Sequence, residues 1–517
     1  MKTLGLKKMK ECRLARESKG EKTPSRRTTR SHERTCWPLL STFILPILFL
    51  ILPVHADAAG RIVYPWKAVP TIVKTGGSFE VWLDAAPGLT VESAQLRGPH
   101  HTLRLAEFTS ESGTWTYDPI SGNTYNTRLT ASVPAGTPAD RYDLVLNTSA
   151  GSVESIRAVS VIPGYKSEYR ILHLSDSHLR DGVNHRDGLL EKKHTAIIRM
   201  ANIINPELVF VTGDNIMYGR NFQQRADIFY LGSEEHGFKG MRHFDAPCFV
   251  VSGNHDHGPE PYEGHYEEKS RFWNQYHGLQ FHGFDYGNSR FMLFSNAWVN
   301  CDWSWQRKWF DDWLENDGAG GNLRVAVAHL AAAGPLGRFV NRNRVGLVLV
   351  GHNHHLGDRN PWKMDDRLIL YYARAVREYH EFNLYSVDDR TGTVTALGMV
   401  NTNEDSDGHG LPTGICKVLA NNELRNEPDT SRWELNLTLE HAKPNDGSSP
   451  ENTATFSNRF DFEIPEARVR FVMPKGADYV VSAGTIAQSF DGDAVRVIDV
   501  DVDLPPNQTT TLHIAPK

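Results

Sequence analysis

The chain has 517 residues, which is too long for a single hydrophobic core, so two to four domains are expected. Its apolar content of 40% and charged content of 23% are ordinary for a globular protein. The formal net charge of −6 gives no electrostatic reason to expect nucleic acid as the main partner.

The N-terminal segment predicts export from the cytoplasm. Residues 1–35 hold twelve Lys or Arg and four Glu, and an apolar run of 16 residues follows from Leu39 to Val54. The run is short for a membrane span, and Ala56-x-Ala58 suits signal peptidase, so residues 1–58 are expected to be a secretory signal peptide. An uncleaved membrane anchor is the open alternative. In both cases the basic flank stays inside, so the rest of the chain is expected to be periplasmic, cell-surface or secreted.

Residues 59–165 are predicted to form an N-terminal β-sandwich of the Ig-like kind. Short runs with alternating apolar residues are separated by Gly, Pro, Asn and Asp turns such as "KTGG" and "VPAGTPAD". The clearest alternation is at Phe79, Val81 and Leu83 and at Tyr142, Leu144 and Leu146.

Residues 166–400 are predicted to form a catalytic domain of the α/β class. Near-continuous apolar runs alternate with helical stretches and suit strands of a sheet buried on both faces. The runs are "ILHL", "ELVFV", "CFVVS", "FMLFS", "RVAVA" and "GLVLV". Trp305, Trp309 and Trp313 are spaced four apart and are expected to form the packed face of a helix.

The remaining residues are predicted to be a linker, 401–414, and a C-terminal β-domain, 415–517. In "VIDVDVDL" the apolar residues alternate with Asp499, Asp501 and Asp503, which we expect to be a solvated strand face. A disulfide between Cys248 and Cys301 is an open alternative in an oxidising compartment.

Polar clusters follow five of the apolar runs in the catalytic segment, at the point where each predicted strand ends. Ligands bind outside the carboxyl ends of the strands in open α/β sheets, so these clusters are expected to converge. The donors are carboxylate, amide oxygen and imidazole, which suit Zn, Mn or Fe, and seven of them suit two metals that share one carboxylate. The predicted metal ligands are Asp176, His178, Asp214, Asn254, His329, His352 and His354.

The ordered motifs "DSH", "GDN", "GNHD", "AHL" and "GHNH" resemble those of the calcineurin-like metallophosphoesterases. The resemblance covers roughly residues 170–400 and implies a four-layer αββα sandwich, flanked here by all-β domains. It also implies the distribution of the ligands between two metals. Asp176, His178 and His354 would hold the first metal, Asn254, His329 and His352 the second, and Asp214 would bridge. His255 would not bind metal but would face the substrate.

The function implied by this resemblance is hydrolysis of phosphate esters through in-line attack by a metal-bridging hydroxide, with His255 aiding departure of the leaving group. "GNHD" looks closer to diesterase-like members than to the 5′-nucleotidases, which usually have "GNHE", so a phosphodiester is slightly favoured over a phosphomonoester. The chain departs from the purple acid phosphatases, which need Asp-x-Gly where this chain has Asp176-Ser-His178, and a Tyr where it has Met217.

The alternative is a non-catalytic binding or surface protein on a phosphoesterase scaffold, but every ligand position is filled, which favours the enzyme. A phosphate ester is the expected partner, and no nucleic-acid-binding surface is evident. Membrane contact is expected only through the N-terminal segment, if it is uncleaved. The oligomeric state is left open.

For several residues near these motifs, both a role in the site and a purely structural role are open. Asp256 is expected to orient other site residues or to cap a helix. His257 and His265 are candidates for substrate contact, although a purely structural role is favoured. Arg180 and Arg220 are candidates for phosphate contact, with surface salt bridges favoured. His355 has no position in the motif and is expected to be outer-shell or exposed.

Overall fold

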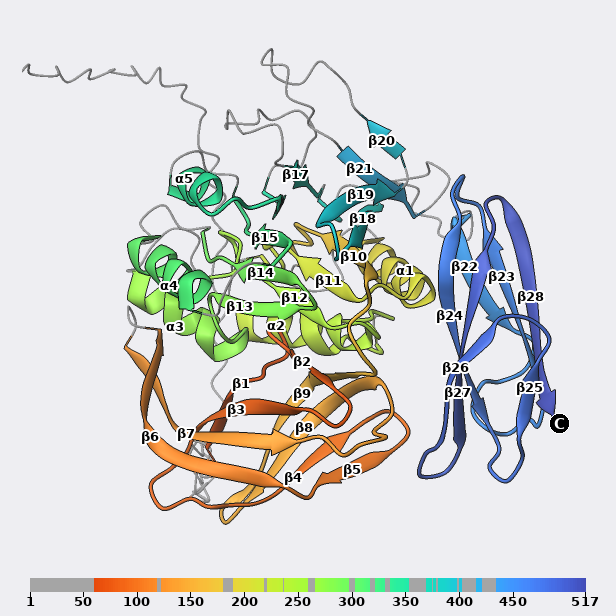
Figure 1. Cartoon of the computed structure of the whole chain (residues 1–517), viewed down its shortest axis with the longest axis horizontal. Helices are drawn as coiled ribbons and strands as arrows, with labels where there is room; N and C mark the ends of the chain where they lie inside the picture. The colour runs from red at the N-terminus through yellow and green to blue at the C-terminus, as the bar shows by residue number, and fades with distance from the viewer. Residues whose placement is uncertain are drawn as a thin grey trace, which may run out of the picture. The chain divides into compact units, whose positions relative to one another are not determined.

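The segment that carries the polar clusters places its strands in two sheets, with helices packed on both (Figure 1). The computed structural model describes residues 60–118, 122–179, 189–217, 221–235, 237–258, 266–296, 303–316, 321–330, 335–352, 369–373, 375–377, 380–397, 399–401, 415–420 and 434–517. The predicted leader and residues 402–414 of the predicted linker lie outside these residues. Within the described part of the chain, no helix combines the length and apolarity that a membrane crossing requires.

The N-terminal segment forms two sheets that share an apolar core. The first has the order β1 (Arg61–Tyr64), β3 (Ser78–Asp84), β7 (Asn123–Ser132), β6 (Phe108–Asp118). The second has the order β2 (Thr71–Lys74), β9 (Gly151–Ile162), β8 (Asp140–Thr148), β4 (Val91–Arg97), β5 (Thr102–Leu105). The predicted alternation is confirmed, because the apolar residues of β3 and β8 are buried in this core: Phe79, Val81, Leu83, Tyr142, Leu144 and Leu146.

A seven-stranded sheet carries the first three polar clusters. Its order is β12 (Cys248–Val250), β11 (Leu208–Val211), β10 (Glu168–Leu174), β18 (Glu381–Asp388), β21 (Ile415–Leu419), β20 (Met399–Asn401), with β19 (Thr393–Leu397) paired to β18. Strands β10, β11 and β12 are parallel, so their carboxyl ends meet at one edge. Residues 415–419, which we expected in the C-terminal β-domain, instead pair with β18 and β20 of this sheet.

The other two clusters follow strands of a second, five-stranded sheet. Its order is β13 (His282–Tyr286), β14 (Ser289–Leu293), β15 (Leu323–Val327), β16 (Leu347–Val350), β17 (Ile369–Tyr372), and β14 to β17 are parallel. The patterning of the runs indicated one sheet, whereas the structure divides them between two. The reason is that the two sheets bury faces against each other: Phe210 stacks on Phe291 with ring centroids 5.4 Å apart, and Phe249 on Phe284 at 4.2 Å.

Helices cover the other face of each sheet. They are α1 (Leu189–Ile204), α2 (Phe222–Leu231), α3 (Tyr266–Tyr276), α4 (Trp303–Asn316) and α5 (Pro335–Arg342), with a 3-10 turn η2 (Met241–His243). Apolar residues of α1 and α2 share a cluster with Leu172 and Val209 of the seven-stranded sheet, and residues of α4 and α5 pack with Ala326 of the other sheet. Two of the three tryptophans of α4, Trp305 and Trp313, pack as predicted. Trp309 is 39% exposed and stacks on Trp313.

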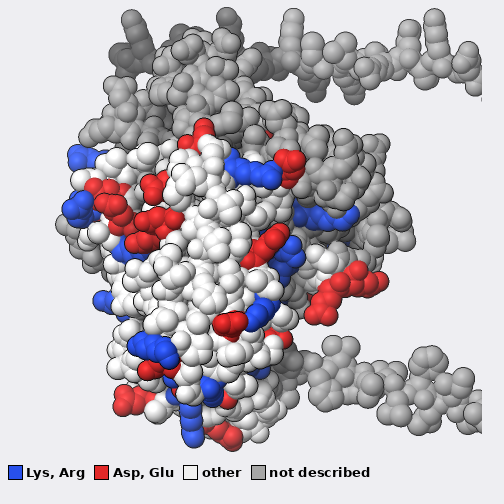
Figure 2. Space-filling model, turned by 90° about the vertical axis from the view of Figure 1, so that its right-hand side faces the viewer, with Lys and Arg blue, Asp and Glu red and all other residues white. Residues whose placement is uncertain are grey.

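The C-terminal segment forms two further sheets. One has the order β22 (Leu437–His441), β23 (Asn452–Asn458), β28 (Gln508–Pro516), β25 (Tyr479–Val481), and the other β24 (Ile464–Met473), β27 (Arg496–Leu504), β26 (Thr485–Asp491). The expectation of a solvated acidic face on β27 is wrong for Asp499. Asp499 is fully buried, because the neighbouring strand provides Arg470, which donates to both of its carboxylate oxygens. Oppositely charged side chains also lie beside one another on the surface, as Figure 2 shows.

Candidate metal centre

The parallel strands bring the predicted site residues together at their carboxyl ends. Asp176 and His178 follow β10, Asp214 follows β11, and His255 follows β12. The five-stranded sheet contributes residues that follow β15 and β16, namely His329 and His352. The structure assembles two groups of potential ligand atoms that share Asp214, and within each group these atoms lie within 4.8 Å of one another.

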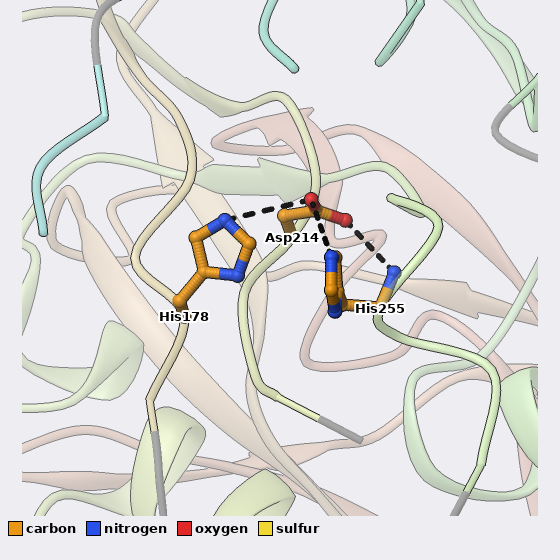
Figure 3. Close-up of side chains that lie close together, drawn as sticks. All are labelled: His178, Asp214 and His255. Atoms are coloured by element: carbon orange, nitrogen blue, oxygen red, sulfur yellow. Dashed lines mark hydrogen bonds and ion pairs between the residues drawn. The ribbon is translucent and has the colours of Figure 1, made fainter. Parts of the chain in front are cut away.

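The first group consists of His178, Asp214 and His255 (Figure 3). The Oδ2 atom of Asp214 lies 3.5 Å from Nε2 of His178 and 3.8 Å from Nε2 of His255. Asp176 adjoins this group, since its Oδ1 is 3.7 Å from the same nitrogen of His178. Both imidazoles therefore point toward one carboxylate oxygen, as Figure 3 shows.

The second group consists of Asp214, His329 and His352, and it uses the other carboxylate oxygen. The Nε2 atom of His329 lies 3.4 Å from Oδ1 of Asp214 and 3.2 Å from Nδ1 of His352. The amide oxygen of Asn254 is also 3.2 Å from this nitrogen. Because Oδ1 and Oδ2 face different groups, the geometry of Asp214 is that of a carboxylate able to bridge two cations.

The tautomer of His329 suits a metal ligand. Its Nδ1–H donates to the backbone carbonyl of Thr212 at 2.6 Å, so Nε2, the atom that faces the second group, is the nitrogen whose proton a metal would replace. Burial by itself lowers the pKa of His329, but the Asp214 carboxylate and its hydrogen bond outweigh burial and raise that pKa to about 9. A positive charge is therefore favoured where a metal would sit, so the donors present fit a cation.

The backbone at the site adopts conformations that most residues avoid. Four predicted ligands, each at or near the end of a strand, have positive φ: Asp176 (54°), His178 (48°), Asp214 (50°) and His352 (70°). Such residues cost free energy and persist only where the surroundings hold them. Here the loops hold one another, because the amide of His178 donates to the carbonyl of Asp214 at 2.8 Å and that of Asp176 to Gly213 at 3.0 Å.

Two glycines of the motifs lie so close to neighbouring loops that no side chain fits there. A Cβ on Gly253 would lie 2.0 Å from the backbone nitrogen of Asp214, and a Cβ on Gly351 would lie 1.8 Å from Oγ of Ser175. The backbone of Asp214 cannot yield by that much, so its loop and that of Gly253 reach contact only where a side chain is absent; at Gly351, Cβ of Ser175 would also be only 2.8 Å away, so the loops of the two sheets meet there for the same reason.

Asp256 joins two of the loops and is not a helix cap. It is fully buried, and its two oxygens accept four N–H donors, from Gly253, Ile216 and twice from Asn215, at 2.8 to 3.0 Å. Burial and the nearby Asp214 raise the pKa of Asp256, and the donors from the backbone oppose that shift. The orienting interpretation is therefore the one that the contacts support.

The structure describes only some of the other residues that the sequence suggested for the site. His354, His355, Arg180, Arg220 and His265 lie outside them. His257 is 3% exposed and packs against the ring of Trp273, so the structure does not support substrate contact by this residue. His255 keeps 17% of its side chain exposed, and burial lowers its pKa to about 4.

Sequence reasoning missed the residues that support the ligands. Asn296 accepts the backbone N–H groups of His329 and Leu330 at 2.9 Å, and His194 of α1 contacts Ser177 at 2.9 Å. Asn296 follows the strand "FMLF" just as the ligands follow theirs, and that signal was available. His194 lies on a helix, where nothing in the sequence marks its contact.

A cavity of about 1120 Å³ lies away from this cluster. Its lining includes Asn205 and Pro206, which precede β11, and Pro247, which precedes β12. These residues mark the amino ends of the strands, whereas the ligand groups lie at the carboxyl ends. The cavity is therefore separate from the candidate metal centre.

Comparison with known proteins shows which protein family this segment resembles. Residues 169–356 match the family model described as calcineurin-like phosphoesterase. Among solved structures, the chain is similar to the purple acid phosphatase PPD1 of yellow lupin (Lupinus luteus), with 12% identity and a TM-score of 0.38 over 65% of this chain and 73% of that one. It is also similar to a dimetal phosphatase from Danio rerio, with 15% identity and a TM-score of 0.28 over 42% of this chain and 92% of that one. Curated protein sequences gave no match.

The matched segment begins in β10 and runs past His354, so it spans every predicted ligand. The family match and the assembled donors together support a metal-dependent hydrolase. Residues 169–356 are thus similar in sequence to the calcineurin-like phosphoesterases.

Proposed function

We propose that this chain is an extracytoplasmic phosphoesterase that uses two metal ions, with a phosphodiester favoured over a phosphomonoester as substrate. The observation that carries the two-metal assignment is the position of Asp214, whose Oδ2 faces His178 and whose Oδ1 faces His329. A carboxylate shared by two ligand groups in this way suits a pair of metals rather than one.

The proposed ligands divide as the motifs suggest. Asp176, His178 and His354 hold one metal, and Asn254, His329 and His352 hold the other, with Asp214 between them. Oxygen and imidazole donors without thiolate suit Mn, Zn or Fe. When bound, two such cations neutralise phosphate oxygens and make an activated water available near neutral pH.

His255 is proposed to assist the leaving group. Its backbone N–H donates to Oδ1 of Asp214 at 2.9 Å, which fixes the residue beside the shared carboxylate. Its side chain is partly exposed, so the imidazole can reach a bound ester and donate a proton or hydrogen bond to the departing oxygen. The geometry also groups His255 with His178 as a possible ligand, and measured metal content separates these two roles.

The layer arrangement of the catalytic domain and the location of the protein outside the cytoplasm are part of the same proposal. The two facing sheets with helices on both support a four-layer αββα catalytic domain, and the sheets before and after it support flanking all-β domains. The basic and apolar leader supports a location outside the cytoplasm. The preference for a diester rests on the "GNHD" motif.

The test is a paired assay with the purified protein. Hydrolysis of a chromogenic monoester and a chromogenic diester is measured with Mn, Zn and Fe, and bound metal is counted by mass spectrometry. The variants are Asp214→Asn, His255→Ala and, as a control, His513→Ala at an exposed position of β28.

Asp214→Asn is expected to lose bound metal and activity together. His255→Ala is expected to keep both metals and lose activity by about 10²- to 10⁴-fold, the usual contribution of a general acid. Unchanged turnover in both variants would overturn the site assignment. Absence of both turnover and bound metal in the unmodified protein would favour a binding protein on this scaffold, and faster turnover of the monoester would contradict the substrate preference.

A further inference from the structure

A serine stands between two of the proposed ligands and is held from outside the loop. Ser177 separates Asp176 from His178, and its Oγ lies 2.9 Å from Nε2 of His194. Ser177 and His194 are each 1% exposed, so water does not compete for this hydrogen bond. His194 belongs to α1, the first described helix after the loop.

The surroundings of His194 decide which of its nitrogens carries the proton. The ring packs against Phe229 and Phe238, with centroid distances of 6.2 and 5.4 Å, and burial lowers its pKa to about 4, so the imidazole is neutral near pH 7. Among the described residues, Nδ1 of His194 has no hydrogen-bond partner. A buried N–H without an acceptor is rarer than an acceptor without a donor, so the proton belongs on Nε2, which donates to Ser177.

The loop needs such support because of its backbone. Both neighbours of Ser177 have positive φ, 54° at Asp176 and 48° at His178. A backbone of this kind relaxes unless the surroundings hold it. Helix α1 can provide that support, because its apolar residues share a buried cluster with Leu172 and Leu174 of the strand that precedes the loop.

We propose that His194 is a positioning residue for the first metal, acting through its hydrogen bond to Ser177 on the loop that presents Asp176 and His178. This inference rests on the proposed function, since it takes those two residues as metal ligands. A partner of this kind outside the ligand set commonly affects metal affinity, because it fixes the orientation of the ligands.

The test measures metal affinity in the full-length protein with Mn²⁺ as the probe. Competition with a chelator gives the two dissociation constants for His194→Leu, Ser177→Ala, their combination, and His194→Gln, whose amide N–H has a reach similar to that of Nε2. The control is His277→Leu, because His277 is also fully buried and bonds to a side chain elsewhere, the hydroxyl of Tyr230 at 2.9 Å. Thermal unfolding of the metal-free proteins shows whether each variant folds.

His194→Leu and Ser177→Ala are each expected to weaken one Mn²⁺ by about 10- to 100-fold and to leave the other near its original affinity. The combined variant is expected to be no worse than either single one, and His194→Gln to regain most of the affinity. His277→Leu is expected to lower thermal stability without changing metal affinity. Should His194→Leu fail to fold, Ser177→Ala still decides the question, because it removes only a hydroxyl.

Wild-type affinity for both metals in Ser177→Ala would overturn this inference, as would additive losses in the combined variant or an equal loss in His277→Leu. A different result marks failure of the proposed function itself. In that case the unmodified protein would bind fewer than two Mn²⁺ ions, or Asp214→Asn would keep both.

Discussion

Replacing Asp256 with asparagine tests whether one carboxylate holds the loops of the site together. The side chain keeps its shape, but an amide N–H₂ takes the place of one oxygen. Oδ1 accepts the backbone N–H groups of Asn215 and Ile216 at 2.9 and 3.0 Å, and Oδ2 accepts that of Gly253 and the side-chain amide of Asn215 at 2.8 and 2.9 Å. Whichever oxygen is replaced, two buried N–H groups lose their acceptor and point at the new NH₂ group instead.

The cost follows from these contacts. A buried donor that loses its acceptor costs about 1–3 kcal/mol, so two such donors cost roughly 2–6 kcal/mol. A typical domain is stable by about 5–15 kcal/mol, so this loss is a large part of the whole. Because the affected donors belong to the loops that present Asp214 and Asn254, we expect metal binding to weaken as well.

The assay is chemical unfolding of the metal-free and metal-loaded proteins, followed by circular dichroism. The control is Glu434→Gln, because Glu434 has a side chain that is 59% exposed and pairs with Arg459, which is 49% exposed, and exposed pairs contribute about 0–1 kcal/mol. An Asp256→Asn protein within about 0.5 kcal/mol of the original would refute the reasoning. It would mean that the carboxyl is protonated or that the four donors find other acceptors.

Three further predictions follow from the same structure. Gly253→Ala places a Cβ 2.0 Å from the backbone nitrogen of Asp214, so both metals and the activity should be lost, whereas Gly164→Ala, with no atom within 4 Å, should change the unfolding free energy by less than about 0.5 kcal/mol. Burial lowers the pKa of His173 to about 3 and of His194 to about 4 from an ordinary 6.5, so the unfolded chain binds protons first as the pH falls. Stability should be full above pH 6.5 and drop by about 1.4 kcal/mol per histidine for each pH unit below it, which a series of unfolding curves would show; a flat profile would contradict it. Removal of metal with a chelator should lower the unfolding temperature and addition of Mn²⁺ should restore it, since a ligand that binds only the folded state stabilises that state, and an unchanged temperature would argue against a built site.

The positions of the strands and of the polar residues that follow them were predictable from sequence. Continuous apolar runs such as "GLVLV" have few alternatives to a buried strand, and a polar cluster at the end of such a run has to lie at the edge of a sheet. His329 and His352 could therefore be assigned to one region although they are 23 residues apart in the chain. The role of Asp256 could not be decided in the same way, because its partners at 215, 216 and 253 meet only when two loops fold against each other.

The sequence by itself determined which residues are candidates for the chemistry, because donor type and strand-end position are local properties of the chain. Only the tertiary structure decided how these residues are supported and shared. The division of the strands between two sheets depends on faces that meet across the core, where Phe210 stacks on Phe291. The burial of Asp499 depends on Arg470 from another strand, and the link from His194 to Ser177 depends on where a helix docks. Such contacts arise from packing between segments distant in sequence, and no local pattern records them.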